Sequence, residues 1–258
     1  YISMKLKGAV IMIGSLLWED ETNCIQLKEP KTTARERAVW RDTKLLLEEK
    51  VQVDLPIRYG RISSSRYCTY SMAFSNSVSE KGTAYYAPYR TKIDVSNYNF
   101  NQLFCQALEL AQVEGISKDG ANNLFKDWGA VGLKFNPKLE KNEPELVKKM
   151  VDFWKYYFKG LKHDLYRIEE AEKHSITKDG ILNFDIEVMD GIDYVLATPV
   201  SPNVKVYPSG EDVARTMMNT REQYFTYFKE NYKNNIRTKD DEDILNCLPE
   251  KVRQELEQ

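Results

Sequence analysis

The first strongly patterned stretch of the chain is an apolar run that ends in acidic residues. Residues 8–13 read GAVIMI; Gly14 and Ser15 follow, and three acidic residues come directly after Trp18. A short run that is partly β-branched and bounded by glycines is typical of a buried strand. We therefore predict a strand that ends in a loop at Gly14 and Ser15.

Alternation of apolar and polar residues predicts several more strands. The segment 55–75 is expected to form two strands around a serine-rich turn, and apolar side chains occupy every other position from Cys68 to Phe74. Pro88 indicates that a further strand, 82–90, lies at a sheet edge or contains a bulge. Three later segments are also predicted to be strands: 128–137, 180–188 and 192–200.

Apolar residues at helical spacing predict the helices. A charged helix is expected within 32–51. A second helix is expected over 99–115, where the apolar stripe runs up to Gly115, a residue that commonly ends helices. The segment 143–174 is predicted to be a long charged helix or a helix pair with one apolar face.

The C-terminal part of the chain continues the helical pattern. Ser209 and Asp212 resemble a capping box that opens an amphipathic helix, and the tail is expected to form two short helices divided at Pro249. No linker or low-complexity segment divides the chain. We therefore predict a single α+β domain over 1–258, with a helical insertion at 138–175.

Composition narrows the class of protein. Apolar residues make up 42% and charged residues 29%, as in ordinary soluble proteins, and a net charge of −2 gives no general attraction to nucleic acid or an anionic membrane. The four cysteines are far apart, which favours reduced thiols. The apolar run before Trp18 imitates a signal peptide but ends in acids, not in small residues, and is too short to span a bilayer. We predict a soluble, cytoplasmic protein.

Most familiar catalytic motifs are missing from the sequence. The only two histidines, His163 and His174, lie in the charged helical segment without a zinc-binding pattern, and we interpret them as surface residues. Neither a Walker loop nor a G-x-G-x-x-G motif occurs. The acidic clusters at 19–21 and 185–193 are interpreted as solvated charge and not as a divalent-ion site. We predict no metal and no cofactor.

Two features still offer chemistry. After the first strand, Gly14 allows the chain to turn so that the amides of Ser15, Leu16 and Leu17 bind a carboxylate or stabilise an oxyanion. Glu114 lies at the predicted C-terminus of a helix, where the helix dipole disfavours a negative charge and favours a general acid or base. Taken singly, each feature is better explained by the simpler interpretation: an ordinary strand-to-loop turn at Gly14, and an exposed glutamate at a helix end for Glu114.

In this order, the two features resemble the γ-glutamylcyclotransferase superfamily, including its glutathione-specific branch. Those proteins open with a strand and a Tyr-Gly-Ser loop, often followed by Leu-Ile-Trp; here IGSLLW at 13–18 occupies that place, with isoleucine instead of tyrosine. The family then has a later strand, a helix and a glutamate that is often followed by glycine. In this sequence the strand at 82–89, the helix from Asn99 and VEGI at 113–116 stand in the same order. DYVLATPVSPN at 193–203 resembles a later family strand.

The resemblance implies a small mixed β-barrel flanked by helices, with the ligand cavity at its mouth. It implies an enzyme that releases 5-oxoproline from a γ-glutamyl amine or peptide without a cofactor. Glu114 would relay the proton from the substrate α-amino group to the leaving amine. The loop residues would bind the γ-glutamyl carbonyl or carboxylate: Ile13, Gly14, Ser15, Leu16 and Leu17.

A binding module without turnover is the alternative. Arg58, Arg61 and Arg66 lie among serines and tyrosines, a combination suited to the phosphate or carboxylate of an anionic small molecule such as a nucleotide. The simpler interpretation of these arginines is solvent-facing charge on a strand pair. Binding of single-stranded nucleic acid by this segment is opposed by the negative net charge. The expected partner is therefore a small molecule, with neither membrane nor nucleic acid.

Overall fold

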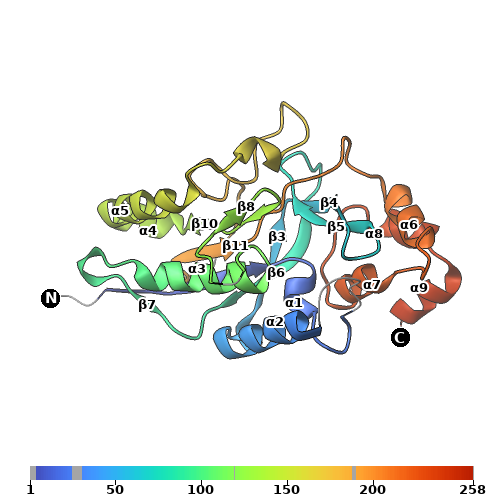
Figure 1. The fold of residues 1–258 in the computed structure, drawn as a ribbon, viewed down its shortest axis with the longest axis horizontal. Coiled ribbons are helices and arrows are strands. Elements are labelled where there is room, and N and C mark those ends of the chain that lie inside the picture. The colour runs from blue at the N-terminus through green and yellow to red at the C-terminus, as the bar shows by residue number, and fades with distance from the viewer. Residues whose placement is uncertain (1–3, 25–30, 119, 188–189, 258) are drawn as a thin grey trace.

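The protein combines a central five-stranded sheet with helices around it (Figure 1). The computed structural model describes residues 4–24, 31–118, 120–187 and 190–257. The strands of the sheet lie in the order β10-β11-β2-β6-β3. Their bounds are β2 Gly8–Met12, β3 Val51–Leu55, β6 Gly82–Pro88, β10 Gly132–Phe135 and β11 Tyr194–Ala197.

The apolar run at the start of the chain forms the middle strand of this sheet. β2 is parallel to β11 and antiparallel to β6, and all five of its residues are buried. A strand with neighbours on both sides and covered faces has no solvent-facing positions, which explains its lack of alternation. The expectation of a buried strand that ends at Gly14 is confirmed.

A separate hairpin follows β3. β4 (Ile57–Ser63) pairs with β5 (Thr69–Phe74) and contains an irregularity between Tyr59 and Arg61. Pro56 joins β3 to β4, and its carbonyl accepts a hydrogen bond from Ser75 at 2.7 Å. The expected serine-rich turn is present. The second strand begins one residue later than its apolar alternation indicated, because Cys68 belongs to the turn and is exposed.

A closed barrel is not found among the described strands. Over the residues that the structure describes, β10 and β3 are the outer strands of an open sheet, and the β4–β5 hairpin is paired separately. Two further strand pairs are short: β1 (Lys5–Leu6) with β7 (Ile93–Asp94), and β8 (Phe125–Lys126) with β9 (Gly129–Ala130). The mixed helix and strand content is confirmed, whereas the barrel is not confirmed.

Three helices surround the end of β2. α1 (Ser15–Trp18) is a single turn directly after Gly14, and α2 (Lys31–Lys44) packs against α3 (Asn101–Val113). α3 ends in a Schellman motif, in which Gly115 has φ +74° and donates to Gln112, while Ile116 donates to Ala111. The predicted helix and its end at Gly115 are both observed.

The segment 138–175 is helical only in part. It contains α4 (Pro137–Asn142), α5 (Pro144–Trp154) and two 3-10 helices, Lys155–Phe158 and His163–Tyr166. It packs on the rest of the protein through Trp154, which is fully buried and donates its indole N–H to Gly180 at 2.9 Å. The long helix expected over 143–174 is therefore replaced by shorter pieces. The strand expected over 180–188 is wrong for its described part, because residues 180–187 form only isolated bridges.

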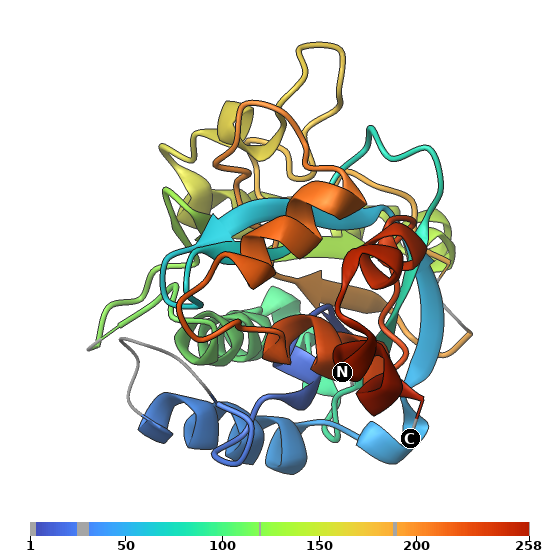
Figure 2. The ribbon, with the colours of Figure 1, turned by 90° about the vertical axis from the view of Figure 1, so that its right-hand side faces the viewer.

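The C-terminal helices cover the end of the molecule opposite α4 and α5 (Figures 1 and 2). The Ser209–Asp212 capping box opens α6 as predicted, and Pro249 separates the last two helices. The single amphipathic helix expected before them is two helices. No helix of the described residues is long and apolar enough to cross a membrane. The bounds are α6 Gly210–Met218, α7 Thr226–Lys233, α8 Asp241–Cys247 and α9 Glu250–Leu256, with further 3-10 turns at Leu47–Glu49 and Ser96–Tyr98.

Candidate functional site

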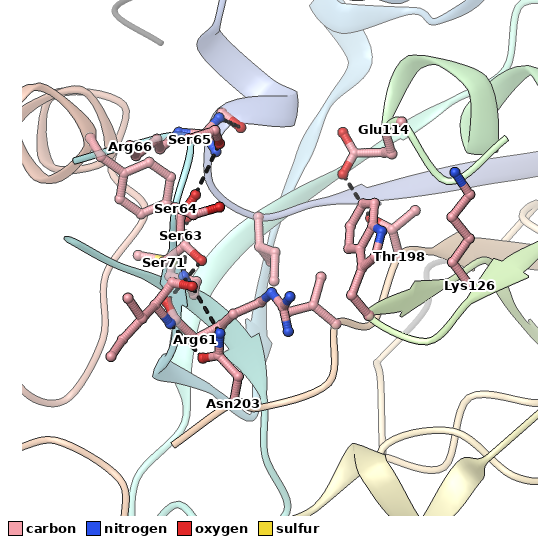
Figure 3. Close-up of a pocket in the computed structure, with 18 of the residues that line it drawn as sticks. Arg61, Ser63, Ser64, Ser65, Arg66, Ser71, Glu114, Lys126, Thr198 and Asn203 are labelled. Carbon is pink, nitrogen blue, oxygen red and sulfur yellow. Dashed lines mark hydrogen bonds between the residues drawn. The ribbon is translucent and has the colours of Figure 1, made fainter. Parts of the chain in front are cut away.

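A cavity of about 420 Å³ lies where the ends of several elements meet. Its wall is formed by the loop after β2, the β4–β5 hairpin, the C-terminus of α3, and the segments around β8–β9 and after β11. Ser15 and Glu114, which the sequence placed in two separate features, both line it. Figure 3 shows Glu114 on one side of the cavity and the serine-rich turn on the other.

Glu114 is held at the end of α3, as the residue just before the Schellman glycine. Its Oε2 accepts a hydrogen bond from Thr198 at 3.3 Å, and its side chain is 18% exposed. Its Oε1 is buried without a hydrogen bond, 3.5 Å from Nε of Arg37. Burial raises the pKa of the Glu114 carboxyl, while Arg37 and Arg66 partly offset this effect. A carboxyl whose pKa lies above its ordinary value is better suited to accept and return a proton during a reaction.

Arg37 is fixed by backbone and by charge. Its Nε and Nη2 donate to the carbonyl of Val113 at 3.1 and 3.0 Å, and Nη1 forms an ion pair with Glu19. The side chain of Arg37 is therefore anchored to the last turn of α3, directly beside Glu114. This anchoring sets the position of a positive charge next to the candidate proton carrier.

Glu19 connects this arginine to a second one. Arg66 lies 3.3 Å from Oε2 of Glu19 and donates to the hydroxyl of Ser15 at 2.9 Å. The side chains thus form one continuous network from Ser15 through Arg66, Glu19 and Arg37 to Glu114. It contains two guanidinium groups and two carboxylates, so protonation of Glu114 leaves a net positive charge at the cavity wall.

The loop after β2 contributes less of its backbone than expected. Gly14 has φ +63°, and the amide of Leu17 donates to the carbonyl of Gly14 at 3.1 Å, so it is not directed at a ligand. The amides of Ser15 and Leu16 begin a one-turn helix and have no acceptor inside it. The side chains of Leu16 and Leu17 are buried, whereas Ile13 and Ser15 line the cavity.

The opposite wall is basic and rich in hydroxyl groups. Arg61 lines it and donates to the carbonyl of Ser201 at 2.6 Å, next to the ring of Trp128. Arg66 also lines the cavity, but Arg58 lies outside it and stacks on Tyr207, 4.0 Å from the ring centre. The remaining polar lining residues include Ser63, Ser64, Ser65, Ser71, Lys118 and Lys126.

Sequence reasoning missed the two residues that complete the charge network. Glu19 belongs to an acidic cluster interpreted as solvated, yet it is only 1% exposed. Arg37 gave a usable signal: Ala34, Arg37 and Arg41 share one face of α2 at helical spacing and are all buried. An arginine on the apolar face of a helix has to find a buried acceptor or acid.

The described residues that line the cavity do not form a recognisable metal site. Among the described residues, the group with suitable ligands is His163, Asp164 and His174, and none of the three lines this cavity. The part of the acidic cluster at 188–189 lies outside the described residues.

Comparison of the chain with models of known protein families, with curated proteins and with solved structures finds no match.

Proposed function

We propose that this protein is a γ-glutamylcyclotransferase-like enzyme that releases 5-oxoproline from a γ-glutamyl amine or peptide. The observation that carries the proposal is that Glu114 and Ser15 line the same cavity. The resemblance in sequence requires these two segments to meet. The pKa of Glu114, raised by burial, also suits proton transfer.

The reaction needs little beyond orientation and proton transfer. The α-amino nitrogen of the substrate attacks its own γ-carbonyl carbon, a five-membered lactam forms, and the bond to the leaving nitrogen breaks. Glu114 accepts the proton from the attacking nitrogen and delivers it to the leaving nitrogen, so it is regenerated. An intramolecular attack has favourable proximity already, and no cofactor enters this scheme.

The two sides of the cavity offer separate roles in this scheme. The amides of Ser15 and Leu16, with Arg66 beside them, suit the carbonyl or α-carboxylate of the γ-glutamyl group. Arg61, on the side of the serine-rich hairpin, and Lys126, on the side of Glu114, also line the cavity and are available to the rest of the substrate (Figure 3).

The proposal is tested by incubating the protein with a panel of γ-glutamyl peptides and γ-glutamyl amines and measuring 5-oxoproline by mass spectrometry. We expect turnover of at least one compound. Glu114→Gln should reduce the rate by about 10²–10⁴-fold, the usual contribution of a general acid or base. Glu109→Gln is the matched control, because Glu109 lies on the same helix and pairs with Lys44 outside the cavity.

Two results would contradict the assignment. Unchanged turnover by the folded Glu114→Gln variant would exclude Glu114 as the proton carrier. An absence of 5-oxoproline from every compound in the panel would argue against the reaction itself. Circular dichroism of each variant establishes that a lost rate does not reflect a lost fold.

Capture of an anionic small molecule without turnover is the second candidate function. It is favoured by the basic residues of the lining, because Arg61, Lys118 and Lys126 line the cavity together with several serines. In that case inorganic phosphate or adenosine diphosphate should raise the unfolding temperature, and Arg61→Met should remove the effect. Turnover of a γ-glutamyl compound without stabilisation by these anions would decide for the enzyme.

A further inference from the structure

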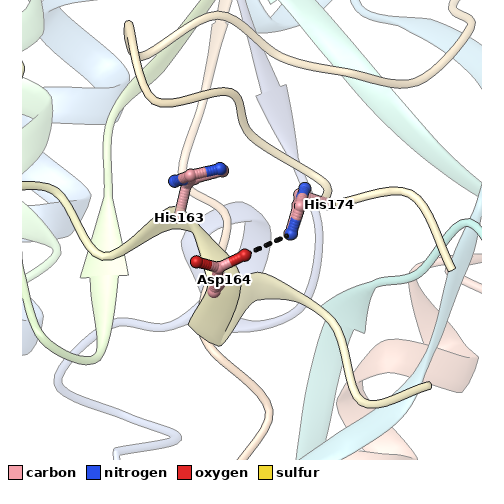
Figure 4. A group of neighbouring side chains, drawn as sticks. All are labelled: His163, Asp164 and His174. Carbon is pink, nitrogen blue, oxygen red and sulfur yellow. Dashed lines mark hydrogen bonds and ion pairs between the residues drawn. The ribbon is translucent and has the colours of Figure 1, made fainter. Parts of the chain in front are cut away.

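We propose that His163, Asp164 and His174 form a surface site for a divalent transition metal of the zinc type, separate from the cavity of Glu114. One ligand atom from each residue lies within 4.8 Å of the other two. Figure 4 shows the three side chains as neighbours, with the His174 ring and the Asp164 carboxylate facing each other and the His163 ring beside them. Two nitrogens and one oxygen are donors that zinc commonly uses.

The ligands come from two segments that the chain brings together. His163 and Asp164 begin the 3-10 helix His163–Tyr166, whereas His174 lies after a loop. The ring centres of the two histidines are 4.6 Å apart, and Nε2 of His174 lies 3.0 Å from Oδ1 of Asp164. Zinc would replace the proton shared by this last pair.

The loop between the ligands is held in place by buried contacts. The carboxylate of Glu172, 5% exposed, accepts hydrogen bonds from Ser75, Tyr207 and the amide of Ile168. The amide of Ser175 donates to the carbonyl of Tyr166 at 3.1 Å, directly beside both ligand segments. Such support reduces the entropy that the ligands lose when a metal binds.

The carbonyl of His174 is fixed as well. It accepts hydrogen bonds from the side-chain amides of Asn76, at 3.3 Å, and Asn183, at 3.0 Å. The backbone of this ligand is therefore tied to two other segments, while its ring is 22% exposed and reachable. A metal entering from solvent meets a ligand of defined position.

The ligand atoms are slightly farther apart than in a zinc site, so one side chain has to move when the metal binds. In a tetrahedral zinc site with bonds near 2.0–2.1 Å, ligand atoms lie about 3.3 Å from one another. Asp164 and His174 already meet this spacing, so rotation of the partly exposed His163 ring has to close the rest. Arg167, 3.9 Å from Asp164, competes for the same carboxylate and should weaken zinc binding. With three protein ligands, at least one coordination position is left for water.

The chain offers an unusually direct test, because it contains only two histidines. Zinc is titrated into metal-free protein with ¹⁵N-labelled imidazole rings, and the ring resonances are followed by NMR together with calorimetry. We expect both rings to shift together and to saturate at one equivalent, while Mg²⁺ leaves them unchanged. Resonances that do not respond to zinc, or only one ring responding, would overturn the proposal.

Variants give an independent measure. His163→Ala, His174→Ala and Asp164→Asn should each weaken zinc binding at least tenfold, and zinc should no longer raise their unfolding temperatures. Asp152→Asn is the matched control, an exposed aspartate paired with Lys155. Cys68→Ser and Cys105→Ser remove two exposed thiols, and binding should survive them. Unchanged affinity in the histidine variants would refute the site, and the wild-type NMR result does not depend on how any variant folds.

Discussion

Arg37 and Arg66 line the cavity, and the carboxylate of Glu19 pairs with both of them. Arg37 is 5% exposed, and only 13% of the Arg66 side chain is exposed, so neither guanidinium is well solvated. A buried cation that loses its acid retains the full cost of leaving water. The network therefore stabilises the fold only as long as its charges remain matched.

Glu19→Gln should lower the free energy of unfolding by about 3 kcal/mol, the usual effect of breaking a buried ion pair. The measurement is urea denaturation near pH 7. Glu21→Gln is the control: Glu21 is exposed and lies two residues away, so its effect should stay below about 0.5 kcal/mol. Equal effects of the two variants would show that the Glu19 network contributes little to stability.

At the residue scale, the sequence was informative where a local rule applied. Glu114 was placed correctly because Gly115 marks the end of a helix, and both residues keep that local relation in the structure. Glu19 and Arg37 could not be paired in advance, because the burial of Glu19 depends on a helix that begins after it in the chain. The sequence shows that a side chain is charged, but it does not show whether that side chain is exposed to solvent or buried against an opposite charge.

At the scale of the element, Gly14 controls how β2 leads into α1. Its φ of +63° and ψ of −143° belong to a region that side chains with a Cβ rarely adopt. A Cβ at this position would also lie 2.3 Å from the hydroxyl of Tyr227 on α7. That hydroxyl accepts a hydrogen bond from the amide of Met72 at 3.1 Å, so displacing it disturbs β5 as well.

Gly14→Ala should lower the free energy of unfolding by about 2–4 kcal/mol, because backbone strain and a side-chain clash add. Gly115→Ala is the control: Gly115 also has positive φ, but no atom lies within 4 Å of its added Cβ, so only about 1–2 kcal/mol is expected. In a Tyr227→Phe background, Gly14→Ala should cost less. A cost unchanged by that background would assign the effect to the backbone alone.

Elements with one dominant signal were predicted well, and elements with mixed signals were not. β2 has an apolar run bounded by glycines and α3 has an apolar stripe that ends at Gly115, and both were placed within a few residues. The segment 143–174 has an apolar face too, but α5 ends at Trp154, and Gly160 adopts φ +88° soon afterwards. The apolar residues of 180–187 pack without a ladder, as Phe184 does on Phe74, so their pattern imitated a strand.

At the scale of the whole molecule, the cavity is a product of contacts between distant segments. Ser15, Glu114 and Tyr227 line it from α1, the end of α3 and α7. The meeting of Ser15 and Glu114 was anticipated only through the resemblance to a family, and Tyr227 was not anticipated at all, because apolar periodicity fixes which face of an element is buried and not which element covers it. The separation of the strands into an open sheet and a hairpin escaped prediction for the same reason.

The pH dependence of the free energy of unfolding is also a property of the whole chain. Acids with a lowered pKa make a protein more stable as the pH rises, whereas two buried acids of this protein have the opposite effect. Burial raises the pKa of Glu114, and it raises the pKa of Asp241 from 3.8 to about 6. Between pH 3.8 and about pH 6, Asp241 keeps its proton in the folded protein but has released it in the unfolded chain. The contribution of Asp241 is therefore most favourable below about pH 4 and is lost as the pH rises through about 6.

Asp241→Asn should accordingly stabilise the protein in a pH-dependent way. The amide can still accept the hydrogen bond from Thr238, now 2.6 Å long, without carrying a buried charge. A difference of about two pKa units, at 1.36 kcal/mol each, predicts a gain of about 2–3 kcal/mol at pH 7 and almost none at pH 4. Urea denaturation across this range measures it, with exposed Asp243→Asn on the same helix as the control. A gain of equal size at pH 4 and pH 7 would show that packing, and not the buried charge, is responsible.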